Sequence, residues 1–166
     1  MKKNLIITLL VILPTITFAQ NLRFKDTILL GKVVSITDGD TFKLLTQDST
    51  LHRIRVANID CPERKQPFSK RAKQFTSDAI FGEIAEVQVS TTDRYGRLIG
   101  VVIYKDSLNL NHELVKAGMA WHFVRYSKDK DLQGIEDKAR LNKVGLWTEN
   151  NPIPPWEWRS NKKSKN

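Results

Sequence analysis

Five charged residues in the first two thirds of the chain have types that suit phosphodiester chemistry. Three are acids and two are arginines, each near an end of an expected strand: Asp40, Asp60, Glu63, Arg55 and Arg97. Carboxylates supply the all-oxygen ligand set of a hard cation such as calcium. A guanidinium group can bind two oxygens of a phosphate at once, where negative charge accumulates during cleavage. Together these residue types predict cation-assisted hydrolysis of a phosphate diester.

The three acids divide into two roles on this interpretation. Asp40 and Asp60, completed by a main-chain carbonyl, would hold the cation and leave room for water and a phosphate oxygen. Glu63 is then left to position or deprotonate the attacking water. The three histidines are scattered along the sequence, which argues against zinc. Each acid taken singly is more often structural, because Asp38-Gly39 is itself a hairpin-turn signal and Asp60 could simply end a strand.

Five extended segments are expected to position these residues. Strand-like patterns cover residues 29–36, 41–45, 51–59, 84–89 and 98–104. Side chains along a strand alternate between its two faces, so Arg53 and Arg55 project in the same direction. Arg53 is outside the motif of charged residues, and a phosphate contact and simple solvation are both open for it.

Three amphipathic helices are expected after the third and the fifth strand. Ser69 can cap the first helix, which continues to Gly82, and the other two cover 109–117 and 131–144. This order of elements predicts an α+β fold, a closed five-stranded OB-type β-barrel with about three α-helices. The three prolines and several lysines after residue 150 predict a tail that lies over the surface or frays.

The first nineteen residues have the pattern of a secretory signal peptide. Lys2 and Lys3 precede an apolar stretch from Leu5 to Phe18, and small residues precede Gln20. The alternative is a single membrane-anchoring helix, but Pro14 interrupts the stretch, which is shorter than the roughly 20 residues of a span. We therefore expect export to the periplasm or the exterior, with no membrane anchor after cleavage.

The expected organisation is one catalytic domain with short flanking segments. It comprises a signal peptide at 1–19, a linker at 20–28, the domain at 29–150 and a basic tail at 151–166. The formal charge is +9 and the pI is about 9.7. This excess of positive charge favours polyanions such as nucleic acids as partners. Cys61 is the only cysteine, so no internal disulfide can form.

Four motifs resemble, in order and spacing, those of the staphylococcal nuclease family. They are Asp38-Gly39-Asp40-Thr41, then Arg55 with Asp60-Cys61-Pro62-Glu63, then Asp93-Arg94-Tyr95-Gly96-Arg97, and Gly145-Leu146-Trp147. The resemblance covers about residues 31–147. It implies an OB-fold nuclease that uses one calcium ion (Ca2+) to hydrolyse DNA and RNA without sequence preference. The products would carry 3′-phosphates. We expect a monomer, although the sequence itself does not fix the oligomeric state.

The resemblance also implies roles for individual residues. Asp40 and Asp60 match the family's carboxylate ligands, and Cys61 matches the position whose main-chain carbonyl binds calcium. Arg55 and Arg97 match the arginines that bind the scissile phosphate, and Glu63 matches the general base. Asp38 fits a supporting acid near the ion. The substrate contacts would come from Arg94, Tyr95 and Tyr126.

Two departures from the family pattern bear on the site. Cys61 replaces a threonine, and its thiol raises the alternative that thiophilic metals inhibit. Val124 replaces a second nucleotide-contacting tyrosine, which leaves Tyr95 and Tyr126 for such contacts. A basic stretch beside the active loop would add charge and hold a single strand without reading its sequence: Lys65, Lys70, Arg71 and Lys73. The aromatic Trp121, Phe123 and Trp147 are expected in the core.

Two other functions are open from the sequence. An OB-fold module of this type can lose its acids and arginines and bind nucleic acid or protein without cutting it. The presence of all five charged residues argues against that non-catalytic binding module. An exported calcium-binding structural protein would need more acids than one small site supplies.

Overall fold

The computed structural model describes residues 26–164, without the side chains of Lys162 and Lys163. The expected signal peptide at 1–19 and most of the linker lie outside the described residues. The first strand begins at Thr27, two residues before the expected start of the domain at 29. No described helix is long and apolar enough to cross a membrane.

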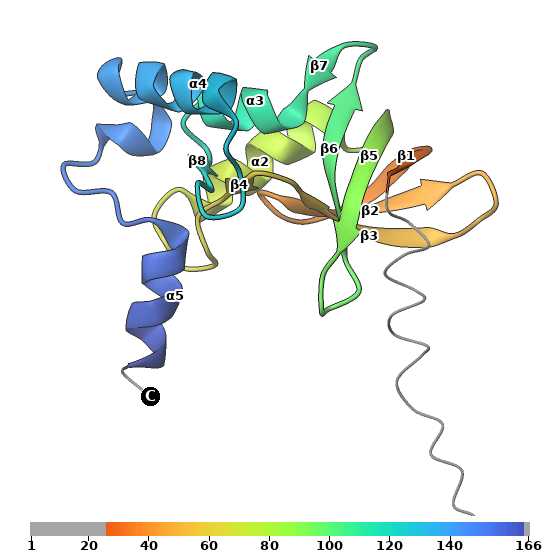
Figure 1. Ribbon diagram of the computed structural model, residues 1–166, viewed down its shortest axis with the longest axis horizontal. Coiled ribbons are helices and arrows are strands. Elements are labelled where there is room, and N and C mark those ends of the chain that lie inside the picture. The colour runs from red at the N-terminus through yellow and green to blue at the C-terminus, as the bar shows by residue number, and fades with distance from the viewer. Residues whose placement is uncertain (1–25, 165–166) are drawn as a thin grey trace, which may run out of the picture.

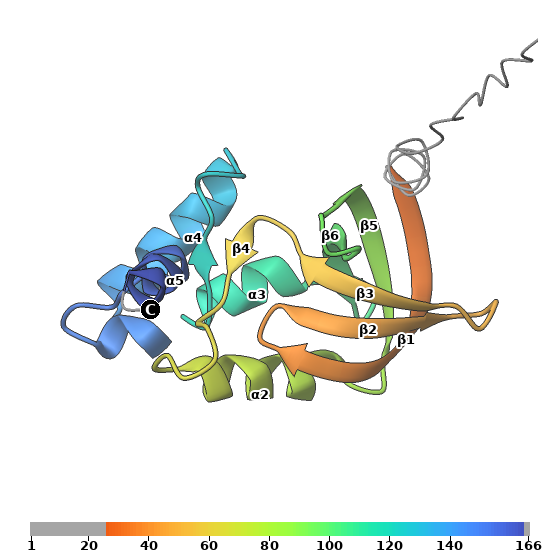
Figure 2. The same cartoon turned by 90° about the horizontal axis from the view of Figure 1, so that it is seen from below.

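A closed five-stranded barrel forms the larger half of the molecule (Figures 1 and 2). Its strands are β1 (Thr27–Asp38), β2 (Thr41–Thr46), β3 (Leu51–Val56), β5 (Ile84–Thr92) and β6 (Leu98–Tyr104). They follow the order β3-β2-β1-β5-β6, and a parallel pairing of β3 with β6 closes the barrel. The predicted OB-type α+β fold and all five predicted strands are confirmed.

Three short strands complete the sheets. The third predicted strand ends at Val56 rather than at residue 59, and Ile59–Asp60 form a separate strand, β4. β4 pairs with β8 (Trp121–His122), whereas β7 (Leu108–Asn109) pairs with β6 in an antiparallel arrangement. The break after Val56 directs the chain out of the barrel, so that Asp60 leaves the sheet that carries Arg55.

Alternation of side chains along the strands fills the barrel. Val33, Phe42, Leu44, Ile54 and Val87 are completely buried inside it. Their neighbours on the same strands are exposed or half-buried, as the period of two requires, except Thr41, which is buried. The register pairs Thr41 of β2 with Arg55 of β3, and the N–H of Val56 donates to the carbonyl of Asp40 at 2.9 Å. This register brings the first hairpin turn beside the end of β3.

Helices cover the barrel end and one side. They are α2 (Ser69–Ile80), α3 (Leu110–Lys116), α4 (Lys130–Leu141) and α5 (Pro155–Lys163), with a 3₁₀ turn, η1, at Gly145–Thr148. The three predicted helices are confirmed, but Ser69 is not the cap of α2. Phe68 takes the N-cap position with a φ of 65° and makes no side-chain capping bond. The side chains of Asn109 and Asp129 do cap α3 and α4.

A second apolar cluster lies between α4, η1 and α5. Trp121, Ala139, Leu146 and Trp147 are buried there, which confirms the core positions expected for both tryptophans. The Gly145-Leu146-Trp147 motif approaches Gly118 closely, since the N–H of Leu146 donates to the carbonyl of Gly118 at 2.9 Å. A Cβ on Gly145 would lie 2.4 Å from that oxygen. This motif therefore has a structural purpose.

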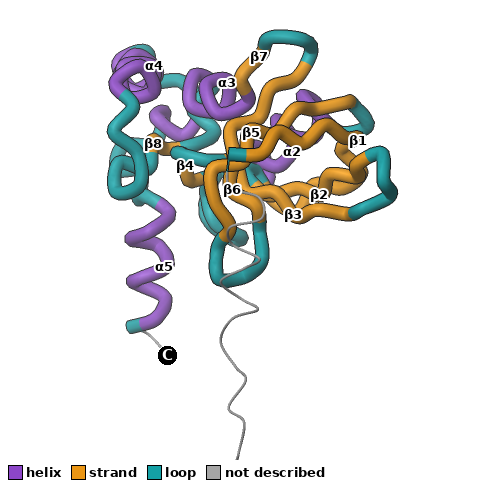
Figure 3. Tube along the Cα trace, turned by 45° about the vertical axis from the view of Figure 1, so that its right-hand side comes forward, coloured by secondary structure: helices purple, strands orange, loops and turns teal. Residues whose placement is uncertain are grey.

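The expected C-terminal tail is in fact helix α5, which Figure 3 shows beside the β4 and β8 segments. Pro155 occupies the first turn, where its fixed φ and missing N–H fit a helix start. The ring of Trp156 stacks on Phe123 at 5.2 Å, with 4° between the planes. The side-chain amide of Gln66 donates to the carbonyl of Ile153 at 2.6 Å. Of the two alternatives, lying over the surface or fraying, the second was wrong, and so was the expectation of no helix, because these contacts come from distant residues.

The hairpin turn after β1 is held tightly against α2. The hydroxyl of Thr76 donates to the carbonyl of Gly39 at 2.6 Å. A Cβ on Gly39 would lie 2.8 Å from the Cβ of Ala72 and 2.9 Å from the Sγ of Cys61. The turn that carries Asp40 therefore has room for glycine only.

Gly39→Ala is expected to lower the free energy of unfolding by about 1–3 kcal/mol, the usual cost of overpacking. The matched control is Gly134→Ala, because Gly134 is a helical glycine whose Cβ would meet nothing within 4 Å. That change should raise the free energy by up to about 1 kcal/mol through helix propensity. Urea unfolding of both variants checks this, and equal effects of the two changes would contradict it.

Candidate active site

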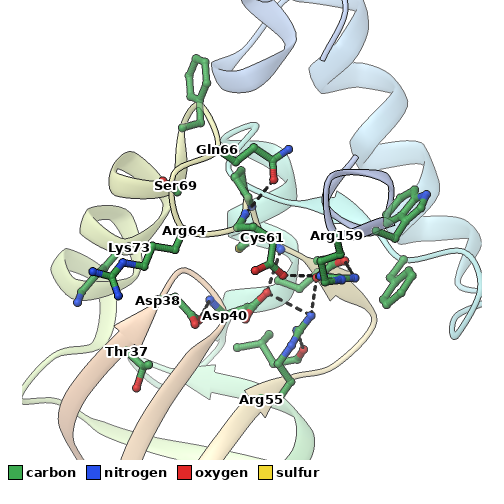
Figure 4. Close-up of a pocket in the computed structure, with 18 of the residues that line it drawn as sticks. Thr37, Asp38, Asp40, Arg55, Cys61, Arg64, Gln66, Ser69, Lys73 and Arg159 are labelled. Atoms are coloured by element: carbon green, nitrogen blue, oxygen red, sulfur yellow. Dashed lines mark hydrogen bonds and ion pairs between the residues drawn. The ribbon is translucent and has the colours of Figure 1, made fainter. Parts of the chain in front are cut away.

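A wide cleft opens at the end of the barrel where three connections meet. These are the β1–β2 turn, the loop after β4 and the β5–β6 hairpin, and α5 adds residues from the far side. Every catalytic, metal-binding and substrate-binding residue expected from the sequence lines this cleft. Figure 4 shows Asp38, Asp40, Arg55, Cys61 and Arg159 gathered in its floor.

One guanidinium group joins the two expected metal ligands. Nη2 of Arg55 lies 2.9 Å from Oδ1 of Asp60 and 3.2 Å from Oδ2 of Asp40. Nη1 of the same arginine donates to the carbonyl of Val56 at 2.6 Å. Asp40 is 6% exposed and Asp60 only 2%. The structure therefore places two carboxylates side by side at the bottom of the cleft, with their charge largely removed from water.

Burial and charge pairing act in opposite directions on these groups. Burial raises the pKa of Asp60, and hydrogen bonding and attraction from Arg159 and Arg55 only partly offset this effect. Burial also disfavours the charge of Arg55, but Asp40 and Asp60 outweigh it and raise the pKa of the guanidinium. Asp38 has its pKa raised to about 6, first by burial and then by the neighbouring Asp40. The floor of the cleft thus concentrates negative charge.

Cys61 presents its backbone to the site and its side chain to the core. Its N–H donates to Oδ2 of Asp40 at 2.9 Å, and the hydroxyl of Thr41 donates to Oδ1 of Asp40 at 3.1 Å. The thiol is buried, and burial, reinforced by Asp40, raises its pKa well above the ordinary value. The backbone of Cys61 therefore contacts an expected metal ligand while its sulfur is buried, and the main-chain oxygen expected from this residue stays a prediction.

Glu63 lies at the mouth of the cleft rather than in its floor. Its side chain is 38% exposed, and its backbone N–H donates to the side chain of Gln66 at 2.9 Å. The carboxylate is thus open to water, whereas Asp40 and Asp60 are not. The structure thus separates two buried acids from an exposed one, and their division into ligands and base stays a prediction.

Arg97 reaches the site from the β5–β6 hairpin. Its Nε donates to Oδ2 of Asp93 at 2.7 Å, and its backbone N–H donates to Oδ1 of the same residue at 3.0 Å. Burial by itself raises the pKa of Asp93, but these bonds outweigh it and lower the pKa. Nη1 of Arg97 lies 3.4 Å from the hydroxyl of Thr41, next to Asp40. Asp93 therefore fixes the direction of Arg97 toward the acids.

Exposed aromatic and basic side chains form the walls. The guanidinium groups of Arg94 and Arg97 lie over the ring of Tyr95, at 4.8 and 5.7 Å from its centre. Tyr126 is 70% exposed and meets Phe123 edge-on at 4.8 Å. The basic stretch expected beside the active loop also lines the cleft: Lys65, Lys70, Arg71 and Lys73. Both tyrosines are thus free to contact a bound molecule.

Arg53 is not part of the cleft lining. Its Nη1 donates to the carbonyl of Tyr95 in the β5–β6 hairpin at 3.5 Å. Although Arg53 and Arg55 alternate onto the same face of β3, only Arg55 turns into the acids. Of the two roles left open for Arg53, the structure gives no support to a phosphate contact within the cleft.

Arg159 is a residue of the site that the sequence interpretation missed. Its Nη2 lies 2.7 Å from Oδ2 of Asp60, and its Nη1 lies 3.3 Å from Oδ1 of Asp60 and 2.5 Å from Oε1 of Glu63. The prediction of a tail that lies over the surface or frays left this arginine out of the site. The available signal was the helix start itself, with Pro155 in the first turn and Glu157 close behind it.

The donor set suits a hard cation. Asp40, Asp60 and the main chain of Cys61 offer oxygen atoms only, and the excess of carboxylates over guanidinium groups in the floor favours added positive charge. Within residues 26–164, no three His, Cys, Asp or Glu side chains form a ready metal cage. An ion here would accordingly be held by two carboxylates and completed by a carbonyl, water and a phosphate oxygen.

Comparison with known proteins gives a consistent result. The family model described as "Staphylococcal nuclease homologue" matches residues 53–149. An uncharacterized endonuclease of Haemophilus influenzae is 36% identical over 161 residues, which cover 97% of this chain and 88% of that protein. A micrococcal nuclease of Shigella flexneri is 40% identical over 139 residues, covering 78% and 79% of the two chains.

A further relative extends the agreement. An uncharacterized endonuclease of Escherichia coli O157:H7 is 38% identical over 132 residues, which cover 80% of this chain and 86% of that protein. The segment that the family model matches, residues 53–149, contains Asp60, Cys61 and both arginines expected to bind phosphate, Arg55 and Arg97. On sequence, fold and site geometry together, the chain belongs to the staphylococcal nuclease family and is a hydrolase of the nuclease class.

Proposed function

We propose that the protein is a calcium-dependent nuclease that hydrolyses DNA and RNA without sequence preference and leaves 3′-phosphorylated products. The observation that carries this proposal is the bridge from Arg55 to Asp40 and Asp60 in the floor of a basic cleft. It joins two buried carboxylates and a phosphate-binding group at one point, as cation-assisted phosphodiester hydrolysis requires. A non-catalytic binding module would lack some of these acids and arginines, and none of them is missing from this site.

The residues of the chain divide the chemistry as follows. Asp40, Asp60 and the main chain of Cys61 would hold calcium, which supplies polarisation of the phosphate and a lowered pKa of a bound water. Glu63, open to solvent, takes the proton of the attacking water. Arg55 and Arg97 donate to the phosphate oxygens on which charge accumulates. Their acid partners hold both guanidinium groups in place before the substrate arrives.

The lining of the cleft supports binding that ignores sequence. Exposed Tyr95 and Tyr126 offer ring faces to bases, and every base has a π-face that can stack on them. The lysines and arginines of the α2 side offer charge to the backbone phosphates. All of these groups come from one chain, so we propose that a monomer is active.

We also propose that the protein is exported. Lys2 and Lys3, the apolar stretch that follows and the small residues before Gln20 support a cleaved signal peptide. Mass spectrometry of the protein recovered from periplasm and medium tests this, and a chain that keeps its first nineteen residues would contradict it.

Glu63→Gln and Arg97→Ala are each expected to lower turnover by about 10²–10³-fold, since one removes the base and the other a transition-state contact. Both side chains are partly exposed, so the free energy of unfolding should change little. The measurement is steady-state cleavage of a DNA oligonucleotide. Arg53→Ala serves as the control for Arg97→Ala, because it removes the same charge at a residue of β3 that does not line the cleft. Wild-type turnover in either test variant would overturn the assigned roles.

Calcium should be required for cutting, and chelation should abolish it, because the cation lowers the pKa of the attacking water and adds polarisation of the phosphate to that of the two arginines. Single-stranded and double-stranded DNA and RNA are incubated with the protein in calcium and then in excess chelator, and the product ends are mapped. Full activity in chelator, or 5′-phosphate ends, would contradict the proposal. Binding without cutting in calcium would favour the binding module instead.

Cys61 should resist thiol reagents in the folded protein, because its sulfur is buried and its pKa is raised. Alkylation by iodoacetamide, followed by mass spectrometry, should proceed only at the rate of unfolding and become fast in urea. By the same argument, thiophilic metals should not inhibit through this thiol. Rapid labelling under native conditions would show that the sulfur faces the site.

A further inference from the structure

Arg159 brings a positive charge to the acids from outside the segment that the family model matches. The match ends at residue 149, whereas Arg159 lies on α5. Its guanidinium group contacts both oxygens of Asp60 and one oxygen of Glu63. Figure 4 shows it entering the floor of the cleft from the side opposite Lys73. The arrangement therefore adds a second cation to the carboxylates beside Arg55.

The contacts of Arg159 occupy the oxygens that a metal ion would use. Oδ2 of Asp60 accepts from Arg159 at 2.7 Å, and Oδ1 accepts from Arg55 at 2.9 Å and from Arg159 at 3.3 Å. A calcium ion binds carboxylate oxygens at about 2.3–2.6 Å. If a calcium ion and a guanidinium group bound the same carboxylate, their positive charges would repel each other across a few ångströms. Ion binding at Asp60 therefore requires that one arginine move.

Arg159 is the arginine that can move. The side chain of Arg55 is 12% exposed and is also fixed by Asp40 and by the carbonyl of Val56. The side chain of Arg159 is 39% exposed, and among the described residues it pairs with Asp60 and Glu63 alone. Helix α5 has other attachments, through Trp156 on Phe123 and through Ile153 on Gln66. The guanidinium group can thus leave Asp60 while the helix stays docked.

We propose that Arg159 is a displaceable counter-cation, which competes with calcium for Asp60 and thereby sets the calcium affinity of the site. In the metal-free protein it offsets the charge of two acids. When calcium binds, it is released into the cleft. This inference rests on the calcium site of the proposed function. Since the coupling is reciprocal, calcium must weaken the hold of the acids on Arg159 as much as Arg159 weakens calcium binding.

Calorimetric titration of the metal-free protein with calcium chloride, without nucleic acid, tests the competition. Arg159→Gln is expected to bind calcium on the order of tenfold more tightly than the wild type, within the usual range of coupling between sites. Arg159→Lys keeps the charge but not the two-pronged contact, so its affinity should be intermediate. Arg64→Gln is the matched control, because Arg64 is an exposed arginine that lines the same cleft.

The possible results separate this inference from the proposed function. Tighter binding in Arg159→Gln but not in Arg64→Gln supports the competition. Equal gains in calcium affinity in both variants would mean that any nearby positive charge has the same effect, and would overturn the proposal. Unchanged or weaker calcium binding in Arg159→Gln would also overturn it. If neither the wild type nor any variant binds calcium, both the inference and the calcium site of the proposed function fail.

A measurement on the wild type removes dependence on variants that fold poorly. Arginine side-chain N–H groups held by buried carboxylates give resolvable NMR signals, and the signals of Arg159 are assigned by their loss in Arg159→Lys. Calcium should shift or broaden the Arg159 signals more than those of Arg97, which is paired with Asp93. Unchanged Arg159 signals at saturating calcium would overturn the proposal.

Discussion

The chain must stabilise two carboxylates that are almost fully buried at the end of its barrel. Removing a charge from water is costly unless a partner and hydrogen bonds replace the lost solvation. Arg55 provides the partner, and the N–H of Cys61 and the hydroxyl of Thr41 provide the bonds to Asp40. These donors come from β2, β3 and the loop after β4, so the acids stay in place only while the barrel is closed and the hairpin turn keeps its register.

The same compensation explains how the site can be both stable and reactive. If fixed arginines occupied every carboxylate oxygen, a cation would have no oxygen left to bind. Here one partner is rigid and one is partly exposed, as the different exposures of Arg55 and Arg159 show. The rigid pair preserves the geometry of the floor, and the exposed pair can be exchanged. A buried ion pair that contributes little net stability can in this way hold a site ready for its ligand.

Local patterns predicted most of the barrel and most of the site. Turn chemistry at Asp38-Gly39, alternation in β3 and the glycine of the β5–β6 hairpin act within a few residues, so they can be recognised in one sequence. The boundary between β3 and β4 could not be predicted, because the apolar residues continue through Ile59 and only tertiary pairing with β8 separates the two strands. The capping of α2 by Phe68 in a left-handed conformation likewise contradicts residue preference.

The role of the last segment depends on contacts that no local pattern contains. Its prolines and lysines are typical of a tail, and its helix has little amphipathic character of its own. The segment is ordered because Trp156 stacks on Phe123 and the carbonyl of Ile153 accepts from Gln66. In addition, Arg159 pairs with two acids whose negative charge it offsets. An excess of acids over arginines in the predicted site is visible in the sequence, however. A site with unbalanced buried charge requires a further cation, and a search for one would have led to the arginines outside the motifs.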